Sequence, residues 1–213
     1  QPENPEMLHL AAEDWNSIYR ESRRQTVTGI VHSGLSFIPE EFLPDEGLMT
    51  KWTAAVFRIE QASRKMDAIV AGVAEKFLGL GLHPVLLKGQ AAARLYREPL
   101  LRECGDIDLY FADRAEWREA VETLAKEGKA LSKVADGSCH YETDGVVVEL
   151  HSKMMDICNP FRQKWLKELE PQFCFDVAEI GGCRINTPSP ELNMLLMSSH
   201  IMKHAFGRGV GLR

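Results

Sequence analysis

The N-terminal part of the chain carries apolar residues at helical spacing. Trp15, Ile18 and Tyr19 begin an apolar stripe after Asp14, a residue type that often caps helices, and residues 24–35 can continue it after a break. The proline-containing turn 38–47 then separates these helices from a longer one.

The longer helix is predicted from Trp52 to Leu80. Its apolar positions recur every three or four residues with charges between them, and Gly79 and Gly81 mark its end. The apolar positions are Val56, Ile59, Met66, Val70, Val73 and Phe77.

The middle of the chain alternates between strand and helix patterns. A short apolar strand at 83–89 ends in glycine, and a helix of small residues follows at 90–96. The strand 105–111 and the amphipathic helix 114–128 come next. Two strand-like runs, 130–135 and 139–143, precede a turn at 143–145 and the strand 146–154, which has the strongest β pattern in the chain.

Beyond Pro160 the pattern predicts a polar helix at 161–170, a hairpin of 173–180 with 183–187, and a helix at 191–206. The order of elements predicts an α+β fold with a mixed sheet and helical additions at both ends. We divide it into an N-terminal helical region (1–82), a core (83–155) and a C-terminal hairpin and helical region (156–213), which together form one compact unit.

Composition restricts the function classes. The chain of 213 residues is 45% hydrophobic and has a formal net charge of −6, which argues against broad binding to extended nucleic acid or to an anionic membrane. Its five cysteines contain no CxxC pair, as expected in a reducing compartment. No apolar run approaches the roughly 18 residues that span a bilayer, and no signal peptide is visible. We therefore expect a cytoplasmic protein without a membrane segment.

Two aspartates in the strand GDIDLYF provide the first candidate chemistry. Asp106 and Asp108 share one face of this strand with Tyr110, about 6.5 Å apart along it, so their charges repel unless a cation lies between them. In the strand VVVELH, Glu149 and His151 also share a face. Three carboxylates on neighbouring strands would hold one or two divalent ions such as Mg²⁺.

A glycine turn provides the second candidate for chemistry, a phosphate-binding site. In 86-LLKGQAAA-93, Gly89 permits a tight turn before a helix whose first N–H groups can bind phosphate, and Lys88 adds a positive charge. The glycine turn, the DxD strand and the later lone acid together indicate a phosphoryl-transfer site.

These motifs, in the order LLKGQAAARLY, LRECGDIDLYF and VVVELH, resemble the DNA polymerase β-like nucleotidyltransferase superfamily. They are most similar to its branch of bacterial uncharacterised nucleotidyltransferases. The resemblance implies a polymerase β-like core and identifies Asp106, Asp108 and Glu149 as catalytic ligands of Mg²⁺ or Mn²⁺. It implies further that Gly89 and Gln90 cradle the triphosphate of an NTP.

The sequence departs from the superfamily at two points. Gln90 replaces the serine that many members have after the glycine, and the fifteen residues between Gln90 and Asp106 are more than the common spacing. The resemblance implies a nucleotidyltransferase, and the acidic net charge makes a small molecule or a protein the expected acceptor in place of a long nucleic acid. The alternatives are a non-catalytic NTP-binding regulatory module and a toxin–antitoxin type component.

Each accessory residue has a structural alternative. Lys88 can bind phosphate or simply end a strand, and Arg102 can reach phosphate or pair with Asp106 or Asp108. His151 can line the site, orient a carboxylate or be a satisfied histidine. Zinc at His200 and His204 is disfavoured because Ile201 lies where a zinc protease motif has glutamate. Cys104 is interpreted as a small apolar filler.

Overall fold

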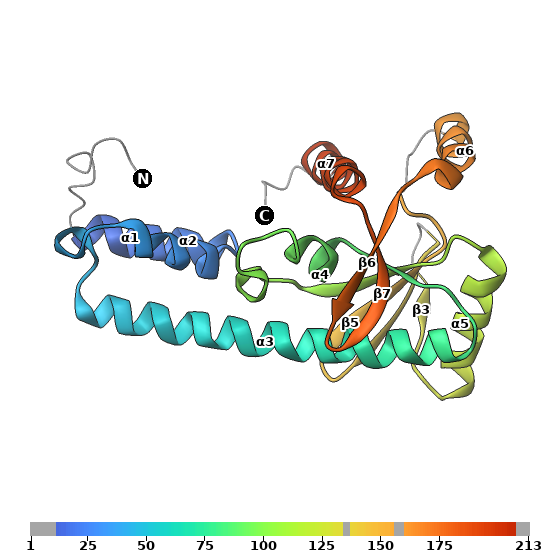
Figure 1. The fold of residues 1–213 in the computed structure, drawn as a ribbon, viewed down its shortest axis with the longest axis horizontal. Coiled ribbons are helices and arrows are strands. Elements are labelled where there is room, and N and C mark those ends of the chain that lie inside the picture. The colour runs from blue at the N-terminus through green and yellow to red at the C-terminus, as the bar shows by residue number, and fades with distance from the viewer. Residues whose placement is uncertain (1–11, 134–136, 156–159, 208–213) are drawn as a thin grey trace.

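A long helix connects the two ends of the molecule. The computed structural model describes residues 12–133, 137–155 and 160–207. In it, helix α3 (Glu46–Gly79) runs along one side, with α1 (Ala12–Arg24) and α2 (Thr28–Gly34) beside its first half and the sheet beside its second half (Figure 1). With 34 residues, α3 is about 50 Å long.

Helix α3 begins earlier than the sequence pattern predicted. The carboxylate of Asp45 accepts a hydrogen bond from the backbone N–H of Leu48 at 3.0 Å, so the helix starts at Glu46 and not at Trp52. This N-cap satisfies a backbone donor that the first helical turn leaves unpaired. The first two helical residues therefore lie inside the segment predicted as a turn, and residues 48–51 fall between that segment and the predicted helix.

The N-terminal helices have a hydrophobic core of their own around Trp52. This side chain is fully buried, its ring lies 5.2 Å from that of Tyr19, and its Nε1 donates to the carbonyl of Thr28 at 3.0 Å. Two 3₁₀ turns, η2 (Leu35–Phe37) and η3 (Glu40–Phe42), connect α2 to α3.

The sheet contains seven strands in the order β3-β4-β5-β2-β1-β7-β6. Strand β2 pairs antiparallel with β1 and parallel with β5, and β1 pairs parallel with β7, so the sheet is mixed as predicted. The strands are β1 (Val85–Leu87), β2 (Asp106–Tyr110), β3 (Ser132–Lys133), β4 (Cys139–Thr143), β5 (Val146–His151), β6 (Phe175–Ile180) and β7 (Cys183–Pro188).

The remaining helices lie near their predicted positions. The helix of small residues begins at Lys88, two positions earlier than predicted, and the strand predicted to reach 154 ends at His151. Of the predicted strand 130–135, Ser132 and Lys133 form β3, residues 130 and 131 belong to no strand, and 134–135 lie outside the described residues. The helices are α4 (Lys88–Ala93), η4 (Pro99–Leu101), α5 (Arg114–Lys126), α6 (Pro160–Leu169), η5 (Glu170–Gln172) and α7 (Pro190–Gly207).

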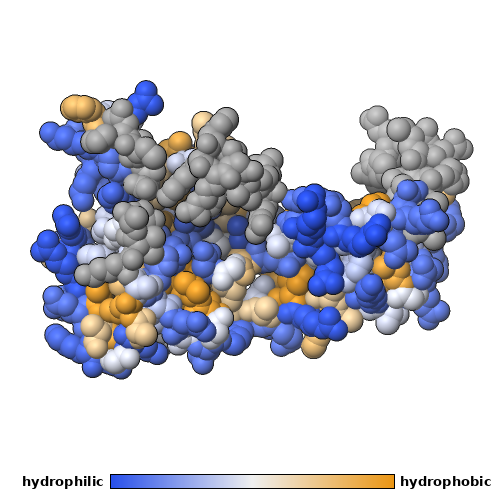
Figure 2. Space-filling model, turned by 180° about the vertical axis from the view of Figure 1, so that it is seen from behind, coloured by the Kyte–Doolittle hydropathy of each residue, from blue (hydrophilic) through white to orange (hydrophobic). Residues whose placement is uncertain are grey.

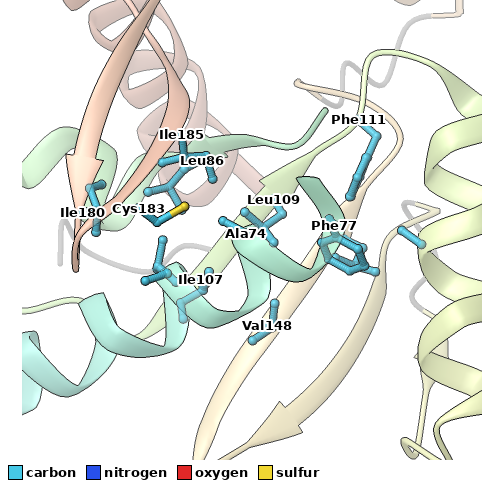
Figure 3. Packing of buried hydrophobic residues seen from close by; sticks show 14 of the residues in the cluster. Ala74, Phe77, Leu86, Ile107, Leu109, Phe111, Val148, Ile180, Cys183 and Ile185 are labelled. Carbon is cyan, nitrogen blue, oxygen red and sulfur yellow. The ribbon is translucent and has the colours of Figure 1, made fainter. Parts of the chain in front are cut away.

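The two faces of β2 belong to different cores. Ile107 and Leu109 pack against Ala74 and Phe77 of α3, as Figure 3 shows, in the main core. Tyr110, on the opposite face, packs with residues of α6 and α7 in a second core. The alternation of apolar and acidic residues along β2 therefore separates a core face from a face that carries both aspartates, as the sequence predicted.

The surface is mainly hydrophilic. In Figure 2, hydrophobic residues form separate orange patches between blue ones on the face shown. Within the described segments, no helix combines the length and the apolar character that crossing a membrane requires.

The contact between α2 and η4 gives a test of the packing. A Cβ on Gly29 would lie 2.8 Å from the carbonyl oxygen of Leu101, which is backbone and cannot rotate away. Gly29→Ala is expected to lower the free energy of unfolding by about 2–3 kcal/mol in urea denaturation, because the close contact must open.

Gly34→Ala in the same helix is the matched control. Nothing lies within 4 Å of a Cβ at Gly34, whose φ of −63° suits any residue. The free energy of unfolding of this variant is expected to rise by about 0.5 kcal/mol. Equal effects of the two substitutions would contradict the packing described at Leu101.

Candidate functional site

The parallel pairing of β2 with β5 brings the acidic residues together. In its register, Asp108 lies opposite Glu149 and Tyr110 lies opposite His151. Asp106 lies opposite Val147, one step nearer the start of both strands. Because side chains two apart share a face, the acids of both strands project from the same side of the sheet.

Burial increases along this face of β2. Asp106 is exposed, whereas Asp108 and Tyr110 are each 1% exposed. The end of this face at Tyr110 is covered by Met154, by Leu166 of α6 and by Leu192 and Leu196 of α7. The Tyr110 hydroxyl donates to Glu170 at 2.9 Å. The acidic residues therefore lie between the exposed start of β2, which we call the open edge of the site, and the covered end of this strand.

The strand-to-helix turn after β1 has an unusual backbone. Lys88 has a φ of +45°, and Gly89 has a φ of 0° with a ψ of −107°. A Cβ at Gly89 would lie 3.3 Å from the carbonyl oxygen of Asp106, so the turn packs closely against the start of β2. Glycine is needed here for the close approach and for the backbone conformation.

The turn places the Lys88 ammonium on the buried Asp108. Lys88 Nζ donates to Asp108 Oδ1 at 2.8 Å, and His151 Nε2 lies 2.7 Å from the same oxygen. The other oxygen, Oδ2, is buried without a hydrogen-bond partner in the described structure. A buried carboxylate with one saturated and one unpaired oxygen is a suitable ligand for an additional cation.

The charges at Asp108 shift the pKa values of the three groups. Burial by itself would raise the pKa of Asp108, but the hydrogen bond from His151 and the charge of Lys88 lower it to about 2. Burial would lower the pKa of His151, but its hydrogen bonds to Asp108 and Glu149 raise it to about 9. Burial also opposes the charge of Lys88, yet the attraction of Asp108 leaves its pKa raised. All three groups are therefore charged at neutral pH.

Glu149 is held by two histidines. Its Oε2 lies 3.2 Å from Nε2 of His151, and its Oε1 lies 3.5 Å from Nε2 of His140. His140 Nε2 is also 2.9 Å from the hydroxyl of Ser138. The carboxylate of Glu149 is thus oriented from both sides on the face that carries Asp108.

Asp106 lies outside this close cluster. Although the residue is exposed, desolvation of its carboxyl and repulsion by Asp108 and Glu149 raise its pKa, against the attraction of Lys88. Its negative charge is therefore unfavourable in the folded chain. A cation that approached from the open edge would relieve this repulsion.

The residues present fit a divalent ion. Asp108, Glu149 and His151 each offer one ligand atom, and these atoms lie within 4.8 Å of one another. Two carboxylates suit Mg²⁺ or Mn²⁺, and His151, whose raised pKa keeps it protonated at neutral pH, would release its proton to join them as a ligand. The sequence predicted three carboxylates as ligands, whereas the compact group has His151 in the place of Asp106.

The other predicted residues lie around the turn. Arg102 Nη1 donates to the carbonyl of Gly89 at 3.1 Å and to Cys104 Sγ at 2.9 Å, and among the described residues it forms no ion pair with either aspartate. Of the two alternatives for Arg102, the ion pair with an aspartate is not formed, and the guanidinium bonds to the turn instead. Gln90 is buried and lines a pocket that contains none of the three acids.

The remaining alternatives concern cysteine and histidine. Cys104 packs against the main core, and burial raises the pKa of its thiol, which is consistent with a filler and not with a nucleophile. The zinc alternative needs both His200 and His204, and the side chain of His204 lies outside the described residues.

Sequence analysis missed His140, although the hairpin contains its signal. The turn at Asp144–Gly145 pairs Thr143 with Val146, and counting back along both strands brings His140 opposite Glu149. The register of a hairpin follows from its turn. The predicted turn was thus sufficient to find this partner of Glu149.

Comparison with known proteins assigns the family. The family described as uncharacterised nucleotidyltransferase matches residues 11–213. The chain belongs to this nucleotidyltransferase family. No curated protein matches it.

Two solved structures are similar to parts of this nucleotidyltransferase family member. An antigenic nucleotidyltransferase-like protein from Paracoccidioides brasiliensis is 19% identical, with a TM-score of 0.42 over 68% of each chain. A Thermotoga maritima structure, described provisionally as a nucleotidyltransferase, is 15% identical, with a TM-score of 0.43 over 66% of this chain and 89% of that one.

The two aspartates of β2 are expected to affect stability in opposite directions. Asp108→Asn removes the charge that pairs with Lys88 and His151, and it is expected to cost about 3 kcal/mol at pH 7 in urea denaturation with a chelator present. Asp106 has a raised pKa, so its ionised form is disfavoured by folding. Asp106→Asn is therefore expected to be neutral or stabilising. A larger loss from Asp106→Asn than from Asp108→Asn would contradict this account.

Proposed function

We propose that this protein is a metal-dependent nucleotidyltransferase that moves a nucleoside monophosphate from an NTP to an acceptor. The proposal rests mainly on Asp108, whose unpaired oxygen lies on a buried carboxylate directly across from Glu149 and beside the Lys88–Gly89 turn. Membership of the nucleotidyltransferase family supports it.

The proposed ligands of Mg²⁺ or Mn²⁺ are Asp108 and Glu149, with Asp106 at the open edge and His151 as an accessory ligand once it has lost its proton. Such an ion, when bound, neutralises phosphate charge and supports in-line displacement. Lys88 leaves Asp108 and contacts the β- and γ-phosphates, which replace the carboxylate as its counter-charge. The backbone N–H groups of Gly89 and Gln90 hold the same phosphates, and Arg102 supports the turn through the Gly89 carbonyl.

The transfer step forms one bond and breaks another. The acceptor hydroxyl oxygen attacks the α-phosphorus, the bond from the α-phosphorus to the bridging oxygen breaks, and pyrophosphate leaves. Glu149 takes up the acceptor proton. Its hydrogen-bonding distance to His151 and the contact with His140 hold this carboxylate in a fixed orientation.

The acceptor is proposed to be a small molecule or a protein. A formal net charge of −6 disfavours a long nucleic acid, whose binding depends on many basic contacts.

One observation favours a second candidate, a non-catalytic NTP-binding module. The side chain of Gln90, where many superfamily members have serine, is buried in a separate pocket and so offers only its backbone to a phosphate. Such a module would bind NTP with the metal and signal through closure of the turn.

An activity assay distinguishes these functions. The protein is incubated with each α-labelled NTP, Mg²⁺ or Mn²⁺ and a panel of small-molecule and protein acceptors. We expect release of pyrophosphate and label transfer, both reduced at least about a hundredfold in Asp108→Asn. Saturable NTP binding without turnover across the panel would instead support the regulatory module.

Metal binding is expected to depend on Glu149. Titration with Mn²⁺, followed by the electron paramagnetic resonance signal of the free ion, should show affinity at least about tenfold weaker in Glu149→Gln, because a charged ligand is lost. Glu142→Gln is the matched control, since Glu142 is an exposed acid on the neighbouring strand β4. Equal affinities in wild type and Glu149→Gln would contradict the proposed ligand set.

A further inference from the structure

A pocket whose lining includes Gln90, the residue after the Gly89 turn, contains none of the residues of the acidic cluster. It has a volume of about 200 Å³ and is enclosed by α3, α4, η4 and the turn between β6 and β7. This volume accommodates a molecule of several non-hydrogen atoms. Its polar lining consists of Ser63, Asp67, Gln90, Arg94, Cys104 and Glu179.

Gln90 is the most informative residue of the pocket. It is 5% exposed, and neither Oε1 nor Nε2 of its side chain has a hydrogen-bond partner within the described protein. An unpaired buried amide costs about 1–3 kcal/mol for each group. Since the side chain lines the cavity, a polar molecule there can hydrogen-bond to the amide once its terminal torsion turns toward the cavity.

The charges that line the pocket favour a cation. Arg94, its one basic residue, is already engaged, because its guanidinium donates to the Thr187 hydroxyl and lies 3.5 Å from Asp176. Asp67 is half-buried and Glu179 lies at the exposed rim. The carboxylates of the lining therefore exceed its available positive charge.

Asp67 itself is poorly compensated. Burial raises the pKa of its carboxyl, and the charge of Arg64 on the same helix opposes this only in part. Ser63, one helical turn away, donates its hydroxyl proton to the Leu100 carbonyl at 2.8 Å and so keeps an oxygen lone pair for a donor. Asp67 and Ser63 thus both present acceptors to the pocket.

We propose that this pocket binds a small polar molecule with a protonated amine, which pairs with Asp67 while its hydroxyl or carbonyl groups hydrogen-bond to the Gln90 amide. Gln90 follows the Gly89 turn directly, so the bound molecule adjoins the segment that faces the acidic cluster. The binding itself requires neither metal nor NTP, and it stands independently of the proposed nucleotidyl transfer.

The test compares two probes that differ only in the amine. Serinol carries a protonated amine between two hydroxyls, and glycerol has a hydroxyl in its place. With ¹⁵N-labelled protein and a chelator present, serinol is expected to shift the side-chain amide signals of Gln90 in a saturable manner. Glycerol should bind at least about tenfold more weakly, because it lacks the charge. The Gln90 signals are assigned by their loss in Gln90→Met.

Two variants of α3 test the carboxylate. Asp67→Asn is expected to abolish the preference for serinol over glycerol and to leave the Mn²⁺ titration unchanged. Glu75→Gln on the same helix, exposed and outside the pocket lining, should retain the preference. Thermal unfolding checks that both variants remain folded.

Two results would overturn the proposal. The first is the absence of saturable shifts of the Gln90 amide with serinol, which would mean that the pocket holds only water. The second is an equal affinity for both probes, which would remove the role of Asp67. Neither result bears on the Mn²⁺ site, so the two proposals can fail separately.

Discussion

The burial of one carboxylate, that of Asp108, constrains the rest of the site. A charge that is 1% exposed on a central strand would be strongly destabilising alone, and the chain compensates it with Lys88 at 2.8 Å and His151 at 2.7 Å. Lys88 reaches it from the turn after β1, where its own φ is +45°, and His151 reaches it because β5 pairs parallel with β2. The glycine turn, the register and the histidine thus together meet a single electrostatic requirement.

This arrangement also connects the site to the proposed chemistry. In the structure Lys88 supplies the positive charge beside Asp108, and a divalent ion between Asp108 and Glu149 would compete with it. On the proposed function, the phosphates of an NTP provide the displaced lysine with a new partner, so that metal and nucleotide favour each other's binding. Asp106, with its raised pKa at the open edge, would gain most from the added cation.

Sequence patterns located the acidic cluster because it depends on local rules. Alternation along β2 and β5 determines which faces carry Asp108 and Glu149, and the glycine turn identifies Lys88. Other features depend on contacts that periodicity does not encode. Three such features join segments that are separated along the chain. They are the parallel pairing of β1 with β7, the bond from Arg102 to the Gly89 carbonyl and the pocket at Gln90. The early start of α3 was missed because the Asp45 cap lies in a stretch that resembles a turn.

The most direct test is a crystal structure with Mn²⁺ and a non-hydrolysable NTP analogue, with the ion located by its anomalous scattering. The account predicts an ion bonded to Asp108 Oδ2 and to Glu149, with the Lys88 ammonium moved from Asp108 to the phosphates. An ion bound elsewhere, with the Lys88–Asp108 pair intact and the nucleotide away from the Gly89 turn, would contradict it.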